Sequence, residues 1–139
     1  RSSDLVETRI VLEVNSIRMC AERRTDDDMV MIEKAHRNFL KYWDTEERVS
    51  YDFAFHRAIA EASHNPVFKA LILIITPDIM NIYNNERICE PNVVVVEEHV
   101  HMVEAIREQD AEKAVLLMNR HMQGVLDFAR AKLPDTSRK

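Results

Sequence analysis

The sequence has almost no glycine. Gly124 is the only one in 139 residues, whereas an average chain of this length contains about ten. With only four prolines as well, the chain is poor in residues that form tight turns, which predicts few strands. Phosphate-binding loops and dinucleotide-binding fingerprints need several glycines at fixed spacing, because only glycine lets the backbone approach a pyrophosphate. Both kinds of site are therefore excluded.

Cysteine, basic charge and long apolar segments are scarce too. Cys20 and Cys89 lack CxxC spacing, which indicates reduced thiols in a cytoplasmic protein more than a disulfide framework. The 19 basic and 24 acidic side chains give a net charge of −5, which argues against binding of a nucleic-acid backbone by this segment alone. The longest apolar run, residues 70–75, is far shorter than the ~20 residues that span a bilayer. Since Glu7 and Arg9 interrupt the first apolar stretch, we expect neither a signal peptide nor a membrane partner.

Helix start signals recur along the chain. Thr25, with Asp28 three residues later, indicates a capping box, in which short oxygen side chains satisfy the free N–H groups of a first helical turn. Asp44 and Glu47 repeat this arrangement. Further signals are Asn65 before Pro66, which is typical of a helix start, and Asp110 before the last apolar stripe.

These signals predict an all-α fold, an antiparallel bundle of six or seven helices. We expect Pro77 to kink or split the fourth helix, and we interpret the β-branched run at residues 93–96 as helix because no partner strand is visible. One domain covers residues 1–133, and residues 134–139 form a polar tail. Three predicted helices cover residues 4–21, 44–63 and 110 to about 133, and three others begin at residues 25, 65 and about 91.

Two histidines interrupt the apolar stripes of the last two predicted helices. His99 and His121 both occupy positions where the helical period places a core residue. Each is eleven residues from Asp110, so in a helical hairpin both lie about 16 Å from the turn. They are therefore expected at the same height on neighbouring helices.

The third predicted helix supplies Asp52 and His56, which are four residues apart and so share one face. A lone inward histidine is more often a hydrogen-bonded core residue than a ligand. Three inward imidazoles and a carboxylate, however, would each cost several kcal/mol if left unpaired in an apolar bundle. A divalent transition metal bound by Asp52, His56, His99 and His121 would compensate. Zinc comes first among the candidates, with nickel, iron, copper or manganese also compatible.

The other three histidines serve as internal comparisons. His101 projects from the opposite side of its helix from His99, and His64 lies in a predicted loop. His36 has no acidic neighbour on its helix face. We predict that none of the three binds metal.

Four segments carry a further pattern: ETRIVLE at residues 7–13, DFAFHRAIAEASHN at 52–65, EHVHMVEAIREQD at 98–110 and AVLLMNRH at 114–121. Together they resemble the FCD ligand-binding domain of FadR-subfamily GntR transcription regulators. The resemblance implies a helical bundle with a metal in its centre, coordinated by Asp52, His56, His99 and His121, and a small organic acid that completes the coordination. It further implies a homodimer that reaches operator DNA through an N-terminal winged helix-turn-helix module, which is absent from this chain.

The resemblance also covers Arg9 and His64. Arg9 matches a family arginine that can face the central cavity and pair with a ligand carboxylate. The alternative role for Arg9 is a surface salt bridge to Glu13. His64 stands where the family often has glycine, so a left-handed backbone there would be mildly strained.

The function implied is an allosteric switch, in which a carboxylate effector binds one arrangement of the bundle better than another and so controls DNA binding. The alternative is a metal-dependent hydrolase or lyase using the same aspartate and histidines. Against an enzyme, the sequence has no HExxH motif and no nucleophile beside a base. A third possibility is an acidic helical interaction domain without any ligand.

Overall fold

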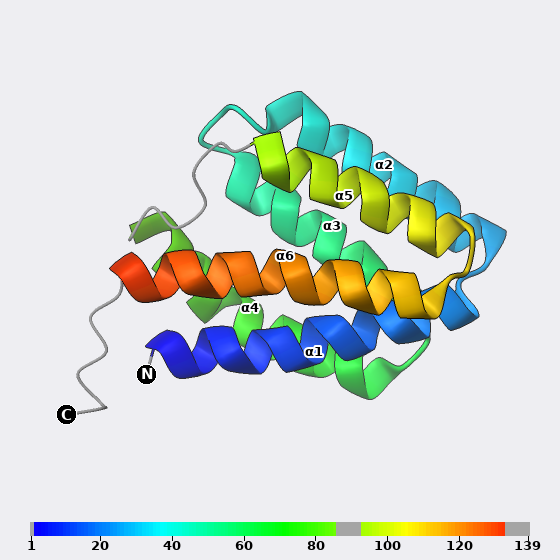
Figure 1. Cartoon of the computed structure of the whole chain (residues 1–139), viewed down its shortest axis with the longest axis horizontal. Coiled ribbons are helices and arrows are strands. Elements are labelled where there is room, and N and C mark those ends of the chain that lie inside the picture. Colours follow the sequence, from blue (N-terminus) through cyan, green and yellow to red (C-terminus); the bar gives the residue numbers. More distant parts are fainter. Residues whose placement is uncertain (1, 86–92, 133–139) are drawn as a thin grey trace.

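Six helices form the protein in the computed structural model, which describes residues 2–85 and 93–132. No strand occurs in these residues, which confirms the predicted all-α bundle. Consecutive helices α5 and α6 run antiparallel side by side, and α6 lies antiparallel along α1 (Figure 1). The helices are α1 Ser2–Arg23, α2 Asp26–Tyr42, α3 Arg48–Ala62, α4 Pro66–Asn85, α5 Val93–Arg107 and α6 Ala111–Lys132.

Three of the predicted helix starts are confirmed. The Thr25 hydroxyl accepts from the Asp28 N–H at 3.1 Å, and the Asp28 carboxylate accepts from the Thr25 N–H at 2.8 Å, which forms the capping box of α2. The Asn65 side-chain oxygen accepts from the N–H groups of residues 67 and 68 at the start of α4. Asp110 accepts from the Lys113 N–H at 3.1 Å at the start of α6.

The predicted start of α3 is wrong. The helix begins at Arg48, and the residue before it, Glu47, has a helical backbone and makes no side-chain capping bond. Asp44 does not cap the helix, because Thr45 organises this turn instead. Its hydroxyl donates to the Tyr42 carbonyl at 2.8 Å and accepts from the Glu47 N–H at 3.2 Å.

Three further local expectations concern Pro77, residues 93–96 and His64. α4 continues through Pro77, so this proline does not split it. α5 begins at Val93, which confirms the helical interpretation of residues 93–96. His64 has a positive φ of 53°, as expected from its place in a glycine position. Cys89, Pro91 and the tail at residues 134–139 lie outside the described residues.

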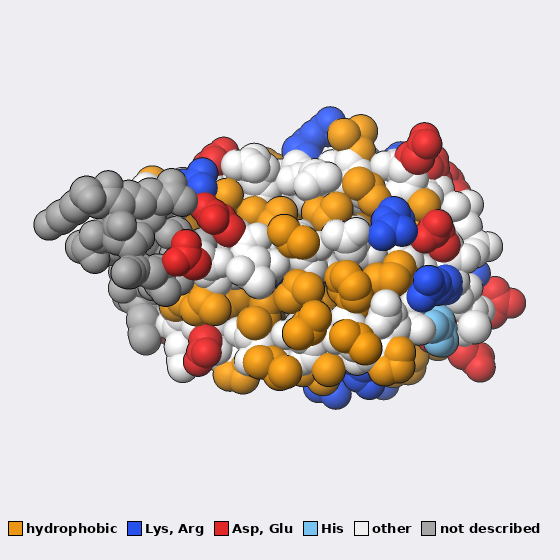
Figure 2. Space-filling model, turned by 90° about the horizontal axis from the view of Figure 1, so that it is seen from below, with side chains coloured by type: hydrophobic (Ala, Val, Ile, Leu, Met, Phe, Trp, Pro, Cys, Tyr) orange, Lys and Arg blue, Asp and Glu red, His pale blue; other side chains and the backbone are white. Residues whose placement is uncertain are grey.

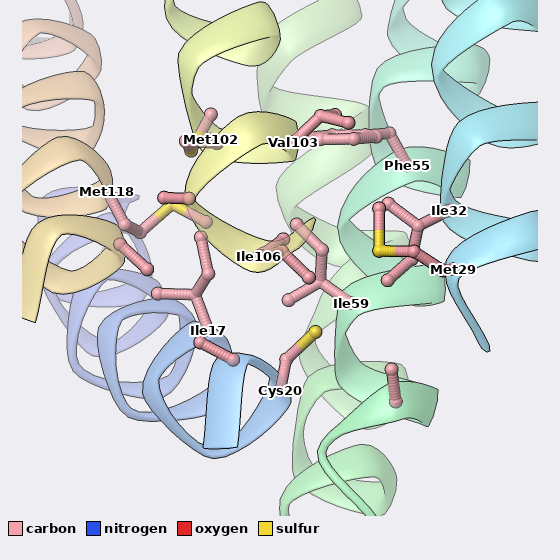
Figure 3. Close-up of a cluster of buried hydrophobic side chains, with 14 of the residues drawn as sticks. Ile17, Cys20, Met29, Ile32, Phe55, Ile59, Met102, Val103, Ile106 and Met118 are labelled. Atoms are coloured by element: carbon pink, nitrogen blue, oxygen red, sulfur yellow. The ribbon is translucent and has the colours of Figure 1, made fainter. Parts of the chain in front are cut away.

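Three apolar clusters fill the bundle. The largest joins α1, α2, α3, α5 and α6 around fully buried Ile17, Phe55, Ile59 and Ile106 (Figure 3). Full burial of each such side chain contributes about 1.5–3 kcal/mol. The two smaller clusters include Val6 and Leu12 of α1, respectively. Arg9 and Glu13 of the same helix are also buried, and these two charged side chains border the candidate site.

α4 is the most exposed apolar helix. Its inner side chains, including Ile72 and Ile79, are buried, whereas Val67 and Ile74 are 66% and 70% exposed. Figure 2, seen from below Figure 1, shows hydrophobic side chains gathered on this side of the molecule. By length and composition alone, residues 66–84 meet the criteria for a membrane span, with 17% of the helix buried. Core helices of proteins outside membranes meet the same criteria, so this helix by itself is weak evidence for a membrane span.

Candidate metal centre

The structure brings the four predicted ligands together inside the bundle. Asp52 and His56 come from α3, His99 from α5 and His121 from α6, and none is more than 4% exposed. The three histidines each present a ring nitrogen, and these nitrogens all lie within 4.8 Å of one another. One oxygen of Asp52, Oδ1, lies 3.0 Å from His99 Nε2 and 3.5 Å from His56 Nε2. Side chains from three helices therefore converge on one point, as the stripe analysis predicted.

Several polar atoms at this point have no hydrogen-bond partner among the described residues. They are Asp52 Oδ1, His56 Nε2 and both ring nitrogens of His99. The short approach of Asp52 to His99 does not have hydrogen-bond geometry. Buried polar atoms normally find partners, and a cation would satisfy three of these four at once. Three imidazole nitrogens and one carboxylate oxygen form a donor set that suits zinc and other divalent transition metals.

Two carboxylates hold the histidines from outside, and sequence reasoning missed both roles. Glu13 of α1, which is 1% exposed, lies 2.5 Å from His56 Nδ1. Glu98 of α5 lies 2.8 Å from His121 Nδ1. A carboxylate on the outer nitrogen is typical of metal-binding histidines, because it fixes the ring and directs the other nitrogen inward.

Arg9 is buried beside this centre, so its interpretation as a surface residue is wrong. It is 2% exposed and packs over the ring of Phe53, with 4.4 Å between the guanidinium carbon and the ring centroid. Its Nη1 donates to the Tyr83 hydroxyl at 2.9 Å, and its Nε lies 3.8 Å from Glu13. Nη2 has no hydrogen-bond partner in the part of the chain that the structure describes. Tyr83 was not predicted, because it lies on α4, far from the motifs.

The buried groups shift one another's pKa values. Burial opposes ionisation of Asp52, but its contacts with His56 and His99 outweigh burial and hold its pKa well below the usual range. Burial also opposes protonation of His56, yet the charge of Glu13 and the contact with Asp52 raise its pKa to about 9. For His99 burial dominates and lowers the pKa to about 4. At neutral pH the metal-free centre therefore holds a charged His56 and a neutral His99.

Comparison with known proteins places this arrangement in a family. The model of the FCD domain matches residues 4–124. The chain belongs to the FCD domain family. The HTH-type transcriptional repressor NanR of Salmonella newport and its counterpart in Salmonella typhi are each 28% identical to it, in an alignment 127 positions long that covers 86% of this chain and 47% of the relative. The chain thus spans about half the length of these curated relatives.

Solved structures agree with this assignment. A GntR protein of Streptococcus agalactiae superposes with a TM-score of 0.77 at 26% identity, covering 91% of this chain and 58% of the other. A transcriptional regulator of the GntR family from Pseudomonas syringae gives a TM-score of 0.72 at 16% identity, with 94% and 57% covered. The second likeness shows the shared fold alone.

The remaining histidines of this FCD domain lie outside the centre. His101 and His64 have side chains that are 57% and 47% exposed, and each lies beside a carboxylate outside the centre, Glu104 and Asp28 respectively. His36 is closer, since its ring centroid is 6.3 Å from that of His99. Its Nδ1 is buried without a hydrogen-bond partner among the described residues. That none of these three binds metal stays a prediction.

A cavity of about 200 Å³ in this FCD domain leads from the surface to the back of the centre. It lies between α3 and α4, and its lining includes exposed Ser50 and Arg57 as well as buried Glu13 and His56. Apolar side chains of α4 form much of the opposite wall. Glu13 and His56 therefore border both this cavity and the candidate metal centre.

Proposed function

We propose that this FCD domain is the effector-binding domain of a GntR-type transcription regulator and that it binds a divalent transition metal through Asp52, His56, His99 and His121. The observation that carries the proposal is the convergence of these four buried side chains with unpartnered nitrogen and oxygen atoms facing one another. The likeness to HTH-type transcriptional repressors supports a regulatory, non-enzymatic role. DNA binding would belong to a helix-turn-helix module elsewhere in the full protein, and the regulator would act as a homodimer.

The second part of the proposal is a small organic acid as effector. With His56 as a neutral metal ligand, Glu13 and Asp52 carry two buried negative charges against the one positive charge of Arg9. A bound divalent cation would supply open coordination positions for an acid oxygen and would leave the centre with a surplus positive charge that one carboxylate balances. Arg9 has an unpartnered Nη2 among the described residues, which is free to donate to that carboxylate.

The third part is how the site acts on the rest of the protein. Arg9 and Glu13 come from α1, whereas the proposed metal ligands come from α3, α5 and α6. An effector held by Arg9 and by the metal centre therefore contacts groups from all four helices. It shifts the bundle only as far as it binds one arrangement better than another. A difference of 1–3 kcal/mol, typical of coupled sites, changes DNA affinity by roughly 5–150-fold.

The metal is tested first. Protein purified without chelator is analysed for bound metal and compared with the H99A and H121A variants, with H101A as the matched surface control. We expect about one metal ion in the wild type and in H101A and much less in the other two. Equal metal content in all four proteins would reject the site.

The effector is tested by thermal unfolding of the metal-loaded protein against a panel of small mono- and dicarboxylates. A true effector at 100 times its dissociation constant stabilises by about 2.7 kcal/mol, and the R9Q variant should lose that gain. No stabilisation by any acid, together with substrate turnover that EDTA abolishes, would favour a metal-dependent hydrolase or lyase instead.

A further inference from the structure

Glu13 contacts two different groups of the site with its two oxygens. Its Oε2 lies 2.5 Å from His56 Nδ1, and its Oε1 lies 3.8 Å from Arg9 Nε. All three side chains are at most 3% exposed. We propose that Glu13 is a positioning residue that fixes the ring of His56 for metal binding and ties it to Arg9. This inference rests on the proposed function, which gives His56 and Arg9 their roles, but it concerns a residue outside the ligand set.

The first half of the inference follows from the two nitrogens of His56. Nδ1 donates to Glu13, so Nε2, which lies 3.5 Å from Asp52 Oδ1, is the nitrogen that would give up its proton and bind a metal through its lone pair. The ring has little freedom to turn away, because Glu13 is carried by the neighbouring helix α1. Loss of such an outer carboxylate typically weakens metal binding 10–100-fold.

The second half follows from a comparison with Glu98. Glu98 holds the outer nitrogen of His121 at 2.8 Å, as Glu13 holds that of His56. Its side chain, however, is 23% exposed, and no arginine in the described ranges lies within ion-pair distance of it. Among the residues that the structure describes, Glu98 therefore pairs with one histidine ring and with no arginine. Glu13 alone of the two joins a metal ligand to the arginine that is proposed to receive the effector.

The metal half is tested with zinc as the probe. Zinc affinity is measured by competition with a chromophoric chelator for the wild type, E13L, E13Q and E98L, after circular dichroism has shown that each is folded. We expect E13L to bind zinc 10–100-fold more weakly and E13Q, which keeps an acceptor oxygen, to fall between E13L and the wild type. Unchanged affinity in both Glu13 variants overturns the inference. Failure of the wild type to bind zinc rejects the proposed function instead.

The coupling half is tested by nitrogen NMR of the histidine rings in the zinc-loaded protein. E13L should shift the ring signals of His56 and leave those of His121 in place, and E98L should do the reverse. R9Q should shift the His56 signals when Glu13 is present and leave them unchanged in the E13L background, or in E13Q if E13L does not fold. An equal shift in both backgrounds means that Arg9 acts on His56 by another route, and this result would overturn the coupling.

Discussion

Replacing His99 by leucine should stabilise the metal-free protein and destabilise the metal-loaded protein relative to the wild type. His99 is fully buried, and neither of its ring nitrogens has a hydrogen-bond partner among the described residues. Its ring stacks on Phe55, with 4.4 Å between centroids, and lies equally close to Phe39. Leucine has a similar volume and is compatible with these apolar neighbours.

The size of the effect follows from the two nitrogens. Nε2 has partial compensation from Asp52 at 3.0 Å, so only Nδ1 counts as a fully unmet group. An unmet buried polar group costs about 1–3 kcal/mol, which H99L recovers. For a domain of this size, 1 kcal/mol corresponds to about 4 °C in Tm, so H99L in EDTA should unfold about 4–12 °C above the wild type. With zinc at 1,000 times its dissociation constant, the wild type gains about 4.1 kcal/mol and overtakes the variant.

Acid should enlarge the difference between the two metal-free proteins. Burial lowers the pKa of His99 to about 4, below the value near 6.5 of an unfolded histidine. Between pH 6.5 and about 4, this histidine is protonated in the unfolded wild type and neutral in the folded state. The free energy of unfolding of the wild type therefore falls as the pH falls through this window. H99L has no titrating group at this position, so its stability does not include this pH dependence.

The assay is thermal and urea unfolding in EDTA and in zinc, with H101L on the same helix as the control. The side chain of His101 is 57% exposed, so H101L should change neither condition by more than about 0.5 kcal/mol. If H99L is less stable than the wild type in EDTA, His99 is well satisfied without metal and the argument fails.

Three further predictions concern the fold. Burial raises the pKa of the Cys20 thiol to about 12, so in a C89A background Cys20 should react with a thiol reagent only after denaturation, and fast reaction of the native protein would contradict its burial. T25A should cost about 1 kcal/mol in urea unfolding. Burial opposes ionisation of the Asp28 carboxyl, but its hydrogen bonds with the Thr25 N–H and His64 together outweigh this and lower its pKa. The capping contribution is therefore present above pH ~4 and lost as the pH falls below it, whereas D28N should show a flatter acid limb. I59A, at a fully buried position, should cost about 2–5 kcal/mol, and a loss below 1 kcal/mol would contradict the packing.

The local part of the fold could be predicted because its causes lie within a few residues. The capping bonds of Thr25, Asn65 and Asp110 each reach two or three positions along the chain. The predicted start of α3 was wrong because Asp44 and Thr45 are both capping residue types, and their identities alone do not show which of them bonds in this turn. The equal spacing of the two histidines from Asp110 was enough to bring them together, because a hairpin of two helices fixes relative height.

The outer carboxylates could not be predicted from helical period alone, because period shows which side of a helix faces inward and not which neighbour it meets. Glu13 meets a histidine 43 positions away. One signal was nevertheless present in α1, where Arg9, Glu13 and Ser16 follow one another at helical spacing and are all buried. Charged side chains on an inward line are costly unless they are paired. An uninterrupted polar line beside the apolar stripe of a bundle helix is therefore itself a sign of a site, and in this chain it indicates α1, a helix that contains no histidine.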